Sequence, residues 1–152
     1  MRRHDQLVAF SLDEQRYALA LMTVERVIRA VEITPLPRAP EIVSGVINIQ
    51  GRVVAVVNVR KRFRLRERDV APSDQIIVAR TPTRTVALVV DMANGVVECS
   101  EERFVSAAAV VPGMEYVTGV VKLDDGLILI HDLDRFLSLE EERSLDDAMG
   151  KA

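Results

Sequence analysis

The sequence predicts a mainly β protein made of two packed, five-stranded β-barrels. Three observations point to this fold: an internal repeat, short apolar runs at the spacing of strands, and few helix signals. The repeat is clearest where VSGVINI at 43–49 returns as VTGVVKL at 117–123. In both copies a turn follows, and then an aliphatic run, at 53–56 and at 127–130.

Two constant offsets relate the copies. Residues 43–56 match residues 117–130 at an offset of 74, and the upstream residues 6–21 match 75–90 at an offset of 69. The second copy therefore holds a five-residue insertion. The alternative is that Val-rich strands of similar length resemble one another through composition alone. Because two segments carry the pattern in the same order, a repeated unit is the preferred interpretation.

Each copy contains five apolar runs of strand length, separated by polar residues, Pro or Gly. They are 6–12, 16–22, 24–31, 45–50 and 52–57 in the first copy, and 75–80, 84–91, 95–99, 117–123 and 126–131 in the second. Strands this short with tight turns favour barrels, because closing a sheet removes the exposed edges through which sheets aggregate.

Short helices are expected after the fifth strand of each copy and at the C-terminus. Asn58 is placed to cap a turn at 58–63, and Asp132 to cap its repeat partner at 132–137. Ser138, followed by three acidic residues, predicts a helix over about 138–149, since capping and the helix dipole both favour this pattern.

The charged, Pro-containing segment 64–74 marks the boundary between the copies, near residue 70. We expect subdomains at 1–70 and 71–152 of one domain overall, and elements are allowed to cross between the barrels. Lys and Arg outnumber acidic residues 13 to 8 in residues 1–70, whereas acidic residues outnumber them 15 to 7 in residues 71–152. This asymmetry favours charged protein partners.

Enzyme chemistry is not predicted. The histidines are His4, in the N-terminal segment, and His131, at a strand end, and neither lies in a catalytic motif. We expect His131 to pack against the neighbouring helix. Cys99 is the single cysteine, so neither an intrachain disulfide nor a cysteine metal site is possible, and we expect it to be buried.

No cofactor or metal site is predicted. The aspartates at 124 and 125 fit a hairpin turn, those at 132 and 134 fit a helix start, and the glycines form no phosphate-binding loop. No apolar run approaches the roughly 18 residues that cross a bilayer, and the N-terminus leads into a strand pattern rather than a signal-peptide core. We therefore expect a cytoplasmic protein without direct membrane insertion.

A basic cluster is the best argument for a nucleic-acid partner. It comprises Arg60, Lys61, Arg62, Arg64, Arg66 and Arg68. Interspersed acidic residues, a pI near 5.5 and only six aromatic side chains count against that partner, since single strands are bound by stacking on aromatic rings.

Strands such as 53–57 and 86–90 are apolar on both faces, although a small barrel has only one interior. The outer face must be covered. Either the other barrel covers all of it, or part of it is a protein-binding surface.

The stretch 45–63, GVINIQGRVVAVVNVRKRF, resembles the signature of CheW-type chemotaxis coupling proteins. Segments 6–10 with 17–21, 89–91, and 116–120 through 132–133 extend the resemblance over nearly the whole chain. The resemblance implies two five-stranded SH3-like barrels. It also implies a non-enzymatic adaptor at receptor arrays beneath the inner membrane. Such adaptors join chemoreceptor cytoplasmic hairpin tips to the regulatory domain of a CheA-type histidine kinase and alternate with kinase domains in rings.

In that family the receptor tip lies in an apolar groove between the barrels. The resemblance places the groove contacts at Val24, Val27, Gly45, Val46 and Ala87, with Arg26, Asn48 and Gln50 beside them. It assigns no kinase-contact residues.

Three positions depart from the family pattern. The family often has Arg at the position of Gln50, an acid near Arg26 and Asp at Asn58. Because a reversed charge at an interface changes partner choice, the alternative is a specialised adaptor or competitor in a non-motility pathway. The remote alternative is a small enzyme or nucleic-acid binder on paired barrels, which fold alone does not exclude.

Overall fold

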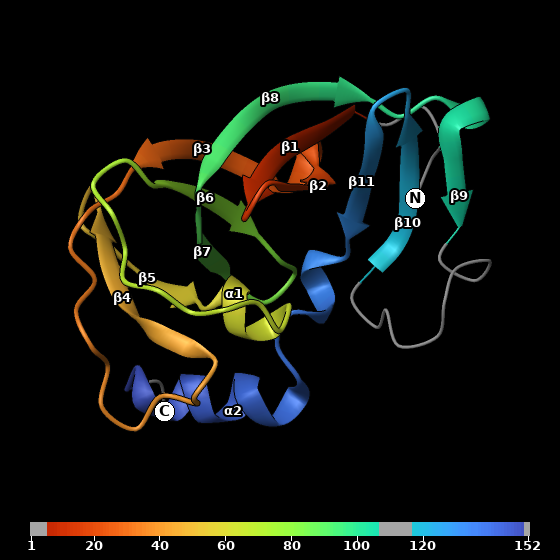
Figure 1. Cartoon of the computed structure of the whole chain (residues 1–152). Coiled ribbons are helices and arrows are strands. Elements are labelled where there is room, and N and C mark those ends of the chain that lie inside the picture. The colour runs from red at the N-terminus through yellow and green to blue at the C-terminus, as the bar shows by residue number, and fades with distance from the viewer. Residues whose placement is uncertain (1–5, 107–116, 151–152) are drawn as a thin grey trace.

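The computed structural model describes residues 6–106 and 117–150 of the 152-residue chain. In these residues a six-stranded sheet of order β8-β1-β2-β11-β10-β9 packs against a five-stranded sheet of order β3-β6-β7-β5-β4 (Figure 1). The strands are β1 Gln6–Leu12, β2 Gln15–Ala20, β3 Val24–Arg29, β4 Val43–Ile49, β5 Arg52–Val57, β6 Gln75–Arg80, β7 Thr85–Val90, β8 Met92–Glu98, β9 Phe104–Ser106, β10 Val117–Leu123 and β11 Gly126–His131. The predicted mainly β fold of two packed β-units is confirmed, and the six-stranded sheet contains the short β9 in addition to the five strands expected of each barrel.

Each sheet takes strands from both sides of residue 70. The N-terminal β1 and β2 join the sheet of β8 to β11, while β6 and β7 join β3, β4 and β5. Four strand pairs join the two parts of the chain: β2 with β11 and β5 with β7 are parallel, whereas β1 with β8 and β3 with β6 are antiparallel. The division into subdomains at 1–70 and 71–152 stays a prediction. In the structure, strands from each side of that boundary pair with strands from the other side in both sheets.

The sequence repeat is also a repeat of strand pairing. Gly45 lies opposite Val56, and 74 residues later Gly119 lies opposite Ile130. Both ladders shift register immediately before the glycine. The ladders of β3 with β6 and of β8 with β1 likewise share one bulge at the offset of 69. Similarity of composition alone does not reproduce identical pairs and bulges, so the repeat is structural.

The chain after β3 and after β8 crosses back toward the far edge of the same sheet. Thr34 exchanges two backbone hydrogen bonds of 2.9 and 2.8 Å with Val46. In the other sheet β9 pairs with β10, and Val105 lies opposite Val120. Each sheet therefore bends toward a barrel, although no continuous ladder of the described residues completes the ring.

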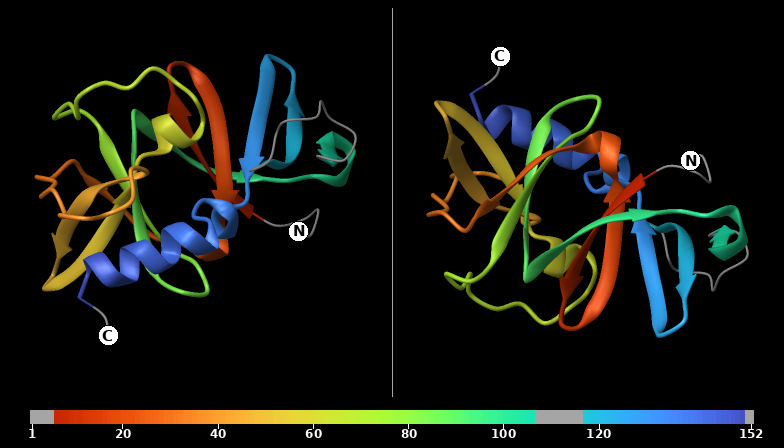
Figure 2. Two further views of the ribbon diagram at one scale, coloured as in Figure 1. Left: turned by 90° about the horizontal axis from the view of Figure 1, so that it is seen from below. Right: turned by 90° about the horizontal axis from the view of Figure 1, so that it is seen from above.

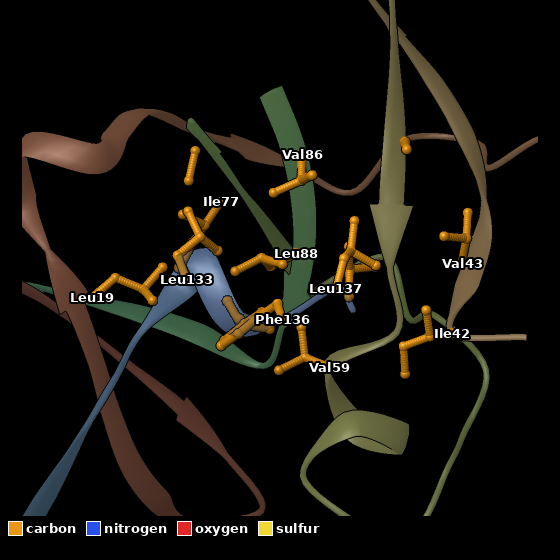
Figure 3. Close-up of a cluster of buried hydrophobic side chains, with 14 of the residues drawn as sticks. Leu19, Ile42, Val43, Val59, Ile77, Val86, Leu88, Leu133, Phe136 and Leu137 are labelled. Carbon is orange, nitrogen blue, oxygen red and sulfur yellow. The ribbon is translucent and has the colours of Figure 1, made fainter. Parts of the chain in front are cut away.

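Apolar side chains on opposite faces of one strand enter different cores. On β5, Val54 and Val56 point into the five-stranded sheet's own cluster, whereas Ala55 and Val57 join a shared cluster between the sheets. The shared cluster includes Leu19, Ile77, Leu88 and Phe136, drawn with others in Figure 3. A third cluster, which includes the buried Cys99, fills the six-stranded sheet. The shared cluster therefore covers the outer face of β5.

The predicted helices are present. The helices are α1 Val59–Arg62 and α2 Leu139–Ala148, and the 3-10 turns are Leu21–Thr23, Glu101–Arg103 and Leu133–Arg135. The Asn58 side chain caps α1, and Asp132 accepts a hydrogen bond at the start of the turn Leu133–Arg135. Ser138 forms a capping box with Glu141 at the start of α2.

Helix α2 closes the shared cluster from the side opposite β3 and β8 (Figures 1 and 2). Its Leu145 has no exposed surface. Arg62 pairs with Glu141 at 2.7 Å, and Arg84 pairs with Glu142 at 2.6 Å and with Asp146. These contacts hold the C-terminal segment against the sheet. Much of the outer face of the strands that are apolar on both faces is therefore covered by the protein itself.

Candidate functional site

The predicted groove residues lie on three strands of the five-stranded sheet. Val24, Arg26 and Val27 belong to β3, which forms one edge of that sheet, and Gly45, Val46 and Asn48 belong to β4 at the other edge. Gln50 follows β4 in the turn to β5, and Ala87 is on β7. The crossing segment at Thr34 brings the two edges together.

Gly45 is buried beneath the crossing segment. A Cβ atom at this position would lie 2.3 Å from the backbone oxygen of Thr34 and 2.9 Å from the Ile33 side chain. Since backbone cannot move aside as a flexible side chain can, the close approach itself requires glycine. The fold thus accounts for this residue. A large substitution here would disturb the sheet as well as any partner.

Asn48 and Gln50 shape the tight turn between β4 and β5. Ile49 pairs with Arg52, so the loop is Gln50-Gly51, and both loop residues have positive φ angles of 49° and 86°. This geometry is typical of a type I′ turn. The Asn48 side-chain oxygen accepts a hydrogen bond of 2.8 Å from the Gly51 N–H. Both residues are nevertheless exposed.

The predicted groove residues differ in the solvent exposure of their side chains. Ala87 has no exposed surface and packs inside the five-stranded sheet with Val54 and Val78. The residues that present exposed side chains are Arg26, Val27, Asn48 and Gln50. Of these, Val27 is the apolar one, and its exposed fraction is 37%.

A surface above the junction of the sheets extends from Val27 to residues that were not predicted. We define the β3–β8 surface as Val27 and Arg29 on β3 with Val96 and Glu98 on β8; all four are exposed. Both strands run along the upper side of the molecule in Figure 1. The sequence does contain a signal for Val96, because the offset of 69 makes it the repeat equivalent of Val27.

Much of the predicted basic cluster is neutralised within the protein. Arg60, whose side chain is 10% exposed, pairs with Asp13 at 3.0 Å and with Asp91 at 2.8 Å. Arg68 pairs with Asp74 at 2.8 Å and with Asp91 at 2.6 Å. We call these five residues the ion cluster. It joins the β1–β2 turn to α1, to the segment before β6 and to the end of β7.

Electrostatics in the ion cluster favour its charged form. Burial acts to raise the pKa of Asp91, but hydrogen bonds from the Asp13 N–H, Arg60 and Arg68 hold that pKa below its usual value. The Arg68 guanidinium likewise lowers the pKa of Asp74. A cavity of about 90 Å³ is lined by four of the five members of the ion cluster, Arg60, Arg68, Asp74 and Asp91, together with Asn58 and Val70. Ion pairs of this kind hold chain segments together. Guanidinium groups that are already paired with carboxylates are less available to bind a phosphate.

His131 packs as expected. It is 7% exposed, its ring stacks on Phe63 at a centroid distance of 3.9 Å, and it lies 5.3 Å from Tyr17. Its place among aromatic rings accounts for it as a packing residue. His4 and the loop around residues 112–113 lie outside the described residues.

Metal sites and membrane-spanning helices are two further classes of feature that the described residues could contain. Across 6–106 and 117–150, no group of three or more His, Cys, Asp or Glu side chains is arranged to hold a metal ion. Over the same part of the chain, no helix has the length and apolar character needed to cross a membrane.

Comparison with known proteins gives one consistent family. A family model described as "CheW-like domain" matches residues 6–141. The chemotaxis protein CheW of Thermotoga maritima is 33% identical over 132 residues, which cover 87% of this chain and 87% of that protein. The Treponema pallidum CheW is 27% identical over 146 residues, with coverages of 92% and 86%. The crystal structure of the scaffolding protein TtCheW from Thermoanaerobacter tengcongensis has a TM-score of 0.81 and 29% identity, and covers 91% of this chain and 95% of that one.

Proposed function

The chain belongs to the CheW-like domain family, and we propose that it is a non-enzymatic adaptor that couples chemoreceptor cytoplasmic tips to a CheA-type histidine kinase. One observation carries the proposal: the CheW-like family model matches residues 6–141, nearly the whole chain. The TM-score of 0.81 to a scaffolding protein supports it. The place of action is then the cytoplasmic face of receptor arrays, in rings shared with kinase regulatory domains.

The distribution of apolar surface supports side-chain docking of a helical partner. Val27 and Val96 remain exposed above the junction. By contrast, Val57 of β5 and Leu88 of β7 are buried in the shared cluster. Helices bind to such surfaces by placing an apolar face on them. Arg26 is also exposed, on the face of β3 opposite to Val27, and carries a charge opposite to the family's usual acid. This charge supports recognition of partners that differ from those of other family members.

Nucleic-acid binding has less support. Arg60, Arg62 and Arg68, three members of the basic cluster, are paired with acidic side chains. Phosphate binding needs cations that can exchange counterions for phosphates. The clustered charge in the sequence is therefore largely structural.

The proposal is tested by calorimetric titration of the full chain against two partners from its own organism: the kinase regulatory domain and the receptor hairpin tip. We expect saturable binding of both. Val27→Arg is expected to weaken tip binding and to leave kinase binding unchanged. Leu139→Arg is the matched control, because Leu139 is also exposed, at 79%, but lies on α2 at the opposite side of the molecule. Absence of binding to every kinase domain and every tip would overturn the proposal.

A further inference from the structure

The β3–β8 surface has two exposed apolar side chains at equivalent positions of the repeat. Val27 and Val96 are 69 residues apart, the offset that relates β3 to β8. They lie opposite Ile77 on β6 and Val8 on β1, respectively. Their exposed fractions are 37% and 55%. Seen from above in Figure 2, both strands cross the near side of the molecule, away from α2. The apolar part of the surface is therefore nearly symmetric.

The charges of the same surface are not symmetric. Two residues beyond each valine, β3 carries Arg29 and β8 carries Glu98, and side chains two apart on a strand point to the same side. Neither residue forms an ion pair with another described residue. Because β3 and β8 run in opposite directions in Figure 1, the cation and the anion lie toward opposite ends of the surface.

The backbone edges of these strands do not favour strand addition. The ladder of β3 shifts register between Val24 and Arg26, and the ladder of β8 shifts opposite Ala9 and Phe10. The backbone of β8 is also irregular at Gly95, which has a positive φ angle of 97°. Bulges bend an edge and interrupt its row of backbone donors and acceptors. A partner therefore engages side chains, as a helix laid across the surface does.

We propose that the β3–β8 surface accepts the helical receptor tip in one direction only, with Arg29 facing an acidic end of the tip and Glu98 facing a basic end. The inference rests on the proposed function and names the residues that select the direction. Val27 and Val96 cannot select it, because they are equivalent. A reversed partner would place like charges together at both ends, which disfavours that complex.

The test uses the full chain, isotopically labelled, and receptor tip fragments from the same organism with a nitroxide at the hairpin turn. In the wild-type complex the nitroxide is expected to broaden the amide signals at the Arg29 end of β3 or at the Glu98 end of β8, but not at both ends. The double variant Arg29→Glu/Glu98→Arg keeps the net charge and is expected to weaken binding about tenfold or to move the broadening to the other strand.

The matched control is Arg143→Glu/Asp147→Arg, an exchange of two exposed charges on α2 at the opposite side. It is expected to change neither affinity nor direction. If the tip binds the wild type but broadens both strands equally, or if exchange of Arg29 and Glu98 changes nothing, the inference is overturned and the adaptor proposal stands. If no tip binds the wild type, the receptor half of the adaptor proposal is overturned as well.

Discussion

Gly45 and Gly119 occupy the same position in the two sheets, each beneath the chain that crosses its own sheet. A Cβ atom on Gly45 would meet the Thr34 backbone oxygen at 2.3 Å, and one on Gly119 would meet the Phe104 ring at 2.5 Å and the Val105 backbone oxygen at 2.7 Å. Both glycines follow a register shift in their ladders. The glycine repeated in the sequence thus marks where each sheet is crossed.

Gly45→Ala is expected to destabilise the protein much more than Gly51→Ala. Both glycines have positive φ, but nothing lies within 4 Å of a Cβ on Gly51, whereas Gly45 has backbone above it. Conformational strain alone costs about 1 kcal/mol at Gly51, and the clash raises the cost at Gly45 to about 3 kcal/mol or more. Urea unfolding of both variants measures the difference. Equal losses would show that the crossing segment yields freely.

Asn58→Asp is expected to destabilise the protein although it restores the family's usual residue. The Asn58 side chain caps α1 through the Lys61 N–H at 3.0 Å, and its amide donates to Glu67 at 2.9 Å. A carboxylate would keep the cap but would face the Glu67 carboxylate, at a cost of about 1 kcal/mol at neutral pH. The measurement is urea unfolding of Asn58→Asp, and the control is the same substitution combined with Glu67→Gln. If Asn58→Asp is equally unstable with Gln at position 67, repulsion is not the cause.

Gln50→Asn is expected to stabilise the β4–β5 hairpin. Gln50 has a φ of 49° in a two-residue turn followed by Gly51, and Asn-Gly is the preferred sequence for this geometry. The gain is expected to be about 0.5 kcal/mol, because Asn tolerates the left-handed region better than Gln. Thermal and urea unfolding would register it. A loss of stability would indicate that the Gln50 side chain makes a contribution of its own.

Asp91→Asn is expected to destabilise the protein most at neutral pH. The pKa values of Asp91 and Asp74 are lowered in the folded state, so the unfolded chain binds more protons in acid. Their contribution is present above the unfolded value of about 3.9 and is lost as pH falls through the folded values. The loss at pH 7 is expected to be about 1 to 3 kcal/mol. A difference from wild type that does not shrink below about pH 4 would contradict this linkage.

The sequence by itself determined the local elements and the repeat. The caps at Asn58, Asp132 and Ser138 act on backbone groups a few residues away, so residue type and spacing suffice to predict them. Short apolar runs bounded by polar residues, Pro or Gly similarly predicted the strands. The offset of 69 also identifies Val27 and Val96 as equivalent positions of the repeat.

Only the tertiary structure decided which strands pair and which surfaces stay open. Copies with similar strands satisfy their hydrogen bonds equally well within a copy or between copies, and the fold uses four pairs between copies: β1–β8, β2–β11, β3–β6 and β5–β7. The burial of Ala87 and the pairing of Arg60 with Asp91 likewise depend on segments distant in sequence. Burial and ion pairing are sums over such distant neighbours, and sequence spacing does not fix them.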